Sequence, residues 1–114
     1  MKANIPTETE KRRAVEKALL PFVESTYLHQ VIGRSEDDTL HAYPDLPDAL
    51  MDLATTKELE WRIHFHVPLF LSTYGDVHST QEDILCVLKL NGERKLTSHL
   101  EVETYTWEVL PEDI

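Results

Sequence analysis

Apolar positions recur along the chain with two periods, and the longer one predicts three helices. In three stretches the apolar residues are spaced three or four positions apart, as on one face of a helix. A Ser/Thr-x-x-Glu capping pattern precedes the first and third stretches, at Thr7–Glu10 and Ser79–Glu82, and Asp45 is the expected N-cap of the second. We expect Pro21 to end or kink the first helix and Asn91-Gly92 to end the third. The three apolar stripes are Val15, Ala18, Leu19 and Phe22; Leu46, Ala49, Leu50 and Leu53; and Ile84, Leu85, Val87 and Leu88.

The shorter period predicts strands, because successive side chains of a strand point to opposite faces. In residues 63–67, Ile63, Phe65 and Val67 alternate with His64 and His66. In residues 100–104, Leu100 and Val102 alternate with Glu101 and Glu103. A shorter apolar stretch at residues 27–32 predicts a third strand, ended by Gly33, while residues 34–44 and 69–78 lack a period and predict loops.

Helices and strands alternate along the chain at nearly equal spacing, which predicts an α/β fold. Each strand-to-strand connection carries one helix, so we expect right-handed crossovers and parallel strands. Parallel sheets are covered on both faces, and the face with His64 and His66 should then point into an enclosed space such as a barrel lumen. About three parallel strands with crossover helices make only part of a TIM barrel. We therefore predict a single domain, residues 1–114, that is a partial barrel completed by association or else a small open sheet.

Composition narrows the class of protein. The chain has 114 residues, a net charge of −10 and one cysteine, Cys86, which lies within an apolar stretch and is expected to be buried. No apolar run approaches membrane-spanning length, no secretion signal is visible and no disulfide can form within the chain, so we expect a cytoplasmic protein without membrane contact. The acidic surplus disfavours nucleic acid as a partner.

The alternating strands also carry the candidate chemistry. Imidazole nitrogens and carboxylate oxygens are ligands of zinc, manganese and similar ions. His66 and Glu103 lie nearest the carboxyl ends of their strands and are the preferred ligands, with His64 and Glu101 one layer deeper and His29 as a third contributor. Glu103 or a metal-bound water is also a candidate for proton transfer next to a carbonyl. The alternatives are hydrogen-bonded or solvated histidines, and carboxylates on the solvent face of an edge strand.

Three segments resemble the C-terminal part of the metabolite traffic protein EboE family: residues 27–31, 60–68 and 99–111. That family resembles the xylose-isomerase-like TIM barrels, which include sugar isomerases and sugar-phosphate epimerases. The resemblance implies a divalent metal ion (Mn, Zn or Mg), held by His66 or His64 on the penultimate strand and by Glu103 or Glu101 on the last. His29 stands where such barrels often carry an acidic ligand.

Two functions follow as hypotheses. The first is a sugar or sugar-phosphate isomerase or epimerase in which a divalent cation bound by His66 and Glu103 assists proton transfer on a polyhydroxylated substrate, with Glu103 and Glu101 as catalytic residues. The second is a non-catalytic module with a role in metabolite traffic, acting by self-association or by binding a protein. A sheet of three strands leaves open edges, so both hypotheses predict a homo-oligomer or a partner chain that completes the sheet.

Overall fold

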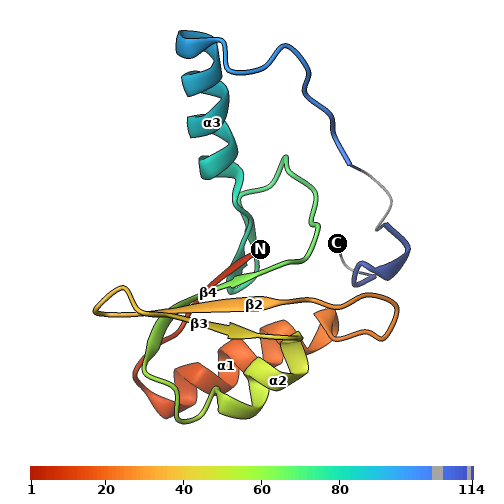
Figure 1. Ribbon diagram of the computed structural model, residues 1–114. Helices are drawn as coiled ribbons and strands as arrows, with labels where there is room; N and C mark the ends of the chain where they lie inside the picture. Colours follow the sequence, from red (N-terminus) through yellow and green to blue (C-terminus); the bar gives the residue numbers. More distant parts are fainter. Residues whose placement is uncertain (104–106, 113) are drawn as a thin grey trace.

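A computed structural model describes residues 1–103, 107–112 and 114 of the chain (Figure 1). Helices and strands follow one another without the regular alternation expected from the sequence. Their order is β1 (Lys2–Asn4), α1 (Thr9–Leu19), the 3-10 turn η1 (Leu20–Phe22), β2 (Val31–Ser35), β3 (Leu40–Tyr43), α2 (Leu46–Asp52), β4 (Glu58–Ile63), β5 (Thr73–Tyr74), β6 (Val77–His78), α3 (Gln81–Arg94) and η2 (Trp107–Val109).

The strands form one six-stranded sheet in the order β3-β2-β4-β1-β6-β5, and the neighbouring strands pair antiparallel. The prediction of parallel strands in a partial TIM barrel is therefore wrong. Its error lies in residues 34–44, which were expected to form a loop. They form a hairpin instead, so the chain reverses direction once more before β4 and β4 runs antiparallel to β2.

The hairpin turn between β2 and β3 has a local cause. Ser35 accepts a hydrogen bond from the Asp38 N–H and donates its own N–H to Thr39, which closes the turn. Asp38 adopts a left-handed conformation with φ of 62°, and Asp tolerates this conformation better than most residues. The run of polar residues thus encodes a tight turn. Hydrophobic periodicity does not reveal the hairpin, because strand β3 carries a single buried residue, Tyr43.

The three predicted helices are present, although their ends differ from the prediction. Helix α1 passes into the 3-10 turn η1 at Pro21, where proline cannot continue the helical hydrogen bonds. The Asp45 side chain caps α2 by accepting from the Leu46 N–H at 2.9 Å. Helix α3 does not stop at Gly92 but continues to Arg94, and Lys95 ends it in a left-handed conformation.

The core lies between one face of the sheet and helices α1 and α2, which lie below the sheet in Figure 1. Strand β4 supplies Trp61, and the residues after it supply Phe65; both belong to the same buried cluster as Leu19 of α1 and Leu46 of α2. Arg12 ties α1 to α2 by donating hydrogen bonds of 2.7–2.8 Å to the carbonyl oxygens of Pro6, Leu53 and Thr56. This half of the molecule therefore has the close packing of an ordinary small domain.

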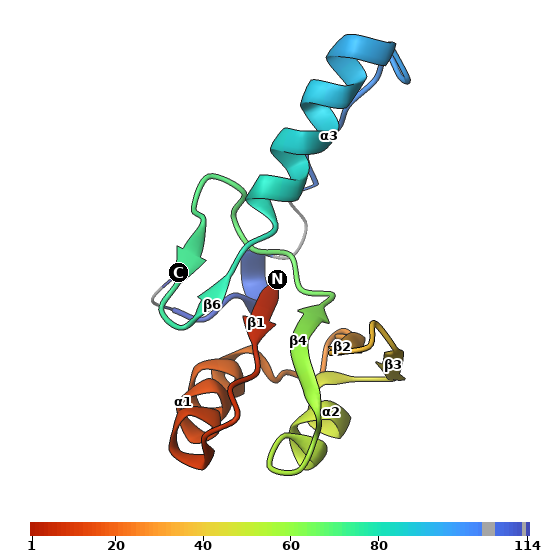
Figure 2. The same ribbon diagram turned by 90° about the vertical axis from the view of Figure 1, so that its left-hand side faces the viewer.

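Helix α3 projects away from this core, as Figures 1 and 2 show. None of its residues is buried, and Cys86 is exposed, contrary to the expectation that it packs inside. Residues 100–103 of the predicted last strand are in no strand of the sheet, and Thr104 lies outside the described residues. None of the helices in the described parts of the chain has the length and apolar character needed to cross a membrane.

Candidate metal-binding site

His64 and His66 follow β4 on the backbone continuation of that strand. The His64 N–H donates to the Gln30 carbonyl at 2.8 Å, and the Phe65 N–H donates to the Ile63 carbonyl at 2.8 Å, which closes a γ-turn centred on His64. Phe65 points into the core, where its ring meets Phe22 edge-on at a centroid distance of 5.0 Å. Phe65 is buried whereas His64 is exposed and His66 partly exposed, so both histidines lie away from the core. The alternation read from the sequence is confirmed here, but His64 is exposed rather than enclosed in a lumen.

The two imidazole rings face each other. His64 Nε2 lies 3.1 Å from His66 Nε2, and the ring centroids are 5.2 Å apart. His66 Nδ1 lies 3.0 Å from a carboxylate oxygen of Glu103, and His64 Nδ1 lies 3.2 Å from the side-chain oxygen of Gln30. The fold thus brings His66, which follows β4, into contact with Glu103, which follows α3.

The hydrogen-bond partners assign the protons of the two rings. A neutral imidazole carries one N–H and one lone pair. Glu103 and Gln30 each present an acceptor oxygen to an Nδ1 atom, which favours Nδ1 as the donor in both rings. The two Nε2 atoms lie 3.1 Å apart, and a proton carried by one of them makes this contact a hydrogen bond. In the tautomer with both protons on Nδ1, each Nε2 offers its lone pair to a cation between the rings.

His29 lies beneath the pair and has a different environment. It is buried, with Nδ1 at 3.1 Å from the His64 carbonyl oxygen and Nε2 at 2.6 Å from Glu24. Both ring nitrogens are therefore in contact with oxygen atoms of the chain itself and are not available to an ion. Burial tends to raise the pKa of Glu24, but the N–H groups of Thr26 and Tyr27 and the His29 ring outweigh it and lower that pKa. His29 fixes the backbone on which His64 stands.

The remaining predicted residue, Glu101, is exposed. Among the residues that the structure describes, no group of three or more histidine, cysteine, aspartate or glutamate side chains surrounds a position for a metal ion. The site consists of two facing imidazoles, with Glu103 next to the Nδ1 atom of His66. A cavity of about 200 Å³ opens beside the pair, and Tyr27, His29 and Phe65 contribute to its wall.

A second polar cluster, which sequence reasoning missed, surrounds Glu58. This buried carboxylate accepts hydrogen bonds from Tyr43 Oη at 3.1 Å and Trp61 Nε1 at 2.5 Å, and His41 Nδ1 lies 3.1 Å away. Burial, reinforced by the Glu58 charge, raises the pKa of Tyr43 to about 12, so the hydroxyl keeps its proton and donates it. Gly33 on β2 leaves room for the Glu58 carboxyl group, since a Cβ there would lie 2.1 Å from it. The cluster closes the end of the core.

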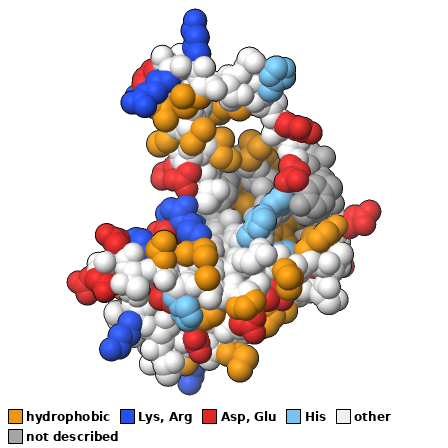
Figure 3. All heavy atoms as spheres, in the orientation of Figure 1, with side chains coloured by type: hydrophobic (Ala, Val, Ile, Leu, Met, Phe, Trp, Pro, Cys, Tyr) orange, Lys and Arg blue, Asp and Glu red, His pale blue; other side chains and the backbone are white. Residues whose placement is uncertain are grey.

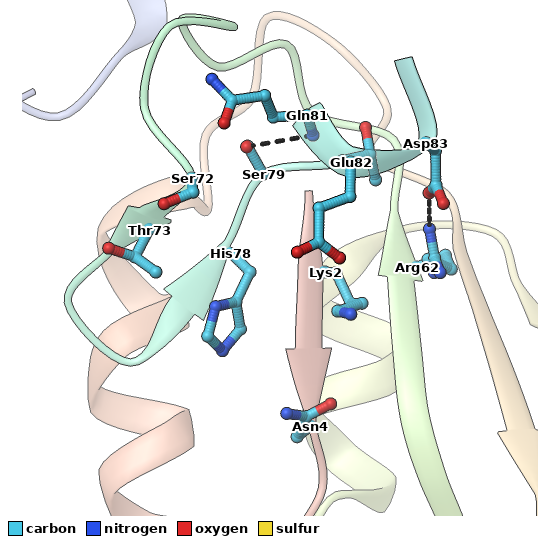
Figure 4. A pocket seen from close by; sticks show the side chains of 11 residues that line it. Lys2, Asn4, Arg62, Ser72, Thr73, His78, Ser79, Gln81, Glu82 and Asp83 are labelled. Carbon is cyan, nitrogen blue, oxygen red and sulfur yellow. Dashed lines mark hydrogen bonds and ion pairs between the residues drawn. The ribbon is translucent and has the colours of Figure 1, made fainter. Parts of the chain in front are cut away.

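A third group of polar residues lines a cavity of about 240 Å³ between β1, β6 and the first turn of α3 (Figure 4). The Lys2 and Glu82 side chains point toward one another there, and Arg62 donates to Asp83 at 2.5 Å. Both signs of charge are present and largely compensate. This cavity therefore favours neither an anion nor a cation. The Arg62–Asp83 ion pair in its wall connects the start of α3 to the sheet.

No protein-family model, curated protein or solved structure matches this chain. The resemblance to the EboE family accordingly stays a prediction from the three sequence segments. Function has to be inferred from the geometry of the chain itself.

Proposed function

We propose that the chain binds a divalent transition-metal cation between the Nε2 atoms of His64 and His66. The observation that carries this proposal is the approach of the two Nε2 atoms to 3.1 Å, with both Nδ1 atoms turned toward acceptor oxygens. Neutral imidazole is a common ligand of Zn²⁺, Cu²⁺ and Ni²⁺. The ion takes the place of the proton between the two nitrogens.

The spacing of the two nitrogens supports this assignment. Nitrogen ligands of zinc lie at about 2.0–2.1 Å from the ion, so two of them in a tetrahedral arrangement are roughly 3.4 Å apart. The separation of 3.1 Å needs only a small outward movement of the rings. His64 is exposed and His66 is partly exposed, so that movement meets little resistance.

Glu103 acts behind His66 in this proposal. A carboxylate that accepts the second N–H of a ligating histidine fixes the ring orientation and increases the basicity of the ligating nitrogen. Glu103 is 56% exposed and lies 3.0 Å from His66 Nδ1, where it can take this role. The sequence prediction of Glu103 as a direct ligand differs from this arrangement, in which it orients a ligand.

Two protein ligands leave coordination positions open to water or to a bound molecule. A sugar or sugar phosphate, the substrate class that the family resemblance implies, offers hydroxyl and phosphate oxygens for such positions. An isomerase or epimerase reaction needs in addition a base that reaches a substrate carbon, for which Glu101 and Glu103 stay the candidates. Cation binding is the part of that hypothesis that the geometry supports best.

Isothermal titration of the metal-free protein with Zn²⁺, Mn²⁺ or Mg²⁺ tests the proposal. We expect one Zn²⁺ per chain, stronger than Mn²⁺ and with no measurable Mg²⁺ binding, since two imidazoles suit zinc and Mg²⁺ prefers oxygen. His64→Ala and His66→Ala should each abolish stoichiometric Zn²⁺ binding, and Glu103→Gln should weaken it about 10-fold. His99→Ala is the matched control because His99 is exposed and contacts Ser98 instead. Equal Zn²⁺ affinity in the His64, His66 and His99 variants would disprove the site.

A further inference from the structure

The chain that returns from the far end of α3 is held by few contacts. Figure 1 shows this return segment, residues 95–103, running from the end of α3 back toward the sheet. Each of its residues is exposed, so burial of apolar side chains does not fix it. Apart from the contact of Glu103 with His66, its described hydrogen bonds lie within the segment or go back to Asn91 of α3. The position of the segment therefore depends on that contact.

The contact joins the return segment to the proposed metal site. A carboxylate oxygen of Glu103 lies 3.0 Å from His66 Nδ1, and the other nitrogen of that ring faces His64. Figure 3 shows hydrophobic side chains over the surface of α3, and histidine and acidic side chains next to one another where the returning chain nears the sheet. Glu103 is 56% exposed, and an ion pair in such a position favours the paired state by about fivefold at most. By itself the contact thus holds the segment for only part of the time.

A cation on the other nitrogen of His66 strengthens this contact. When Nε2 gives its lone pair to a metal ion, the ring becomes more positive and its Nδ1–H becomes a stronger donor to the carboxylate. A carboxylate partner of this kind raises metal affinity by about 10-fold or more. Binding effects between two sites are reciprocal, so the cation favours the pairing of Glu103 with His66 by the same factor.

We propose that the cation locks the return segment onto the sheet, an inference that rests on the metal site proposed for His64 and His66. Without the ion the segment exchanges between attached and detached positions, and with the ion bound Glu103 stays at His66. The start of α3 is already held by the Arg62–Asp83 ion pair. The cation therefore adds a second fixed point, at the other end of the α3 arm.

Distances between two spin labels test the proposal. In a Cys86→Ser chain, which lacks the one native cysteine, Leu100→Cys places a label on the return segment and Met51→Cys places one on α2. Both positions are exposed, at 66 and 83%. Double electron–electron resonance should give a broad distance distribution in EDTA and a narrow one at saturating Zn²⁺. Mg²⁺ should leave the distribution broad, since it prefers oxygen ligands.

Two glutamate variants of the labelled chain decide whether Glu103 carries the effect. Glu103→Gln keeps an acceptor oxygen but removes the charge. We expect its distance distribution to stay broad with Zn²⁺ bound, and its Zn²⁺ affinity to fall about 10-fold. Glu101→Gln is the matched control, because Glu101 lies on the same segment and is also exposed. Its distribution should narrow with Zn²⁺ as in the labelled chain without a glutamate substitution.

Calorimetry on the same chains separates this coupling from the metal site itself. Zn²⁺ binding with an unchanged distance distribution would overturn the coupling and leave the site standing. Narrowing that persists in Glu103→Gln would also overturn the coupling, because another contact would then hold the segment. Absence of Zn²⁺ binding in the calorimeter would remove the site and the coupling together. Circular dichroism of each variant verifies that the fold is retained.

Discussion

The half of the molecule built from α1, α2 and strands β2–β4 buries its apolar side chains, whereas α3 buries none. Both regions show clear helical stripes in the sequence. The difference is that the stripes of α1 and α2 meet a sheet face that offers Trp61 and Val31, while the opposite sheet face near α3 is polar, with Lys2, Asn4 and Arg62. An amphipathic pattern thus predicts that a helix needs an apolar partner, without indicating where the partner lies.

The largest expected effect contrasts side-chain truncation in the two regions. Trp61→Ala removes a fully buried ring and should lower the free energy of unfolding by about 3–5 kcal/mol. Leu88→Ala removes a side chain on α3 that is 42% exposed and should change it by no more than about 0.5 kcal/mol. Urea unfolding of both variants gives the comparison. Similar losses would mean that α3 is packed within its own copy.

A smaller effect contrasts two glycines. Gly33→Ala drives a Cβ to within 2.1 Å of the Glu58 carboxyl group and should cost about 1–3 kcal/mol through overpacking and displaced hydrogen bonds. Gly92→Ala meets no atom within 4 Å and should stabilise α3 by about 0.5–1 kcal/mol, because alanine has the higher helix propensity. Thermal unfolding and helical circular dichroism measure the two changes. A neutral Gly33→Ala would show that Glu58 can leave its position without loss.

The smallest effect is a pH dependence at Glu24. Its pKa is lowered in the folded state, so on acidification the unfolded chain takes up the proton first and stability falls with pH. The contribution is complete above the ordinary glutamate pKa and is lost as the pH drops through the lowered one. Glu24→Gln should therefore cost about 1 kcal/mol at pH 7 and progressively less at acid pH.

The exposed Glu101 provides the control for this comparison, because Glu101→Gln should leave the unfolding curve unchanged at both pH values. Urea unfolding at pH 7 and at pH 3 measures both variants. If the cost of Glu24→Gln were the same at pH 3 and pH 7, the carboxylate would not be the group that stabilises the fold.

Local features of the site were accessible from the sequence, and its assembly was not. Alternation around Phe65 placed His64 and His66 on one face, and the structure agrees. The same reasoning put Glu103 on a neighbouring parallel strand, whereas Glu103 reaches His66 from a segment outside the sheet. The sequence pattern did not indicate that Glu58 is buried, because a glutamate in a strand usually faces water. Its burial is explained by the hydrogen bonds that Tyr43 and Trp61 donate to it in the folded chain.

The sequence by itself determined the three helices, the proline and aspartate signals at their ends, and the two faces of the segment around His64. These features depend on neighbours within a few residues, where period and backbone geometry act directly. Only the tertiary structure decided that the strands pair antiparallel, that His64 and His66 meet Gln30 and Glu103, and that the α3 stripe stays uncovered. Strand partners are chosen by contacts between distant segments, and an undetected hairpin reverses the direction of each strand that follows it.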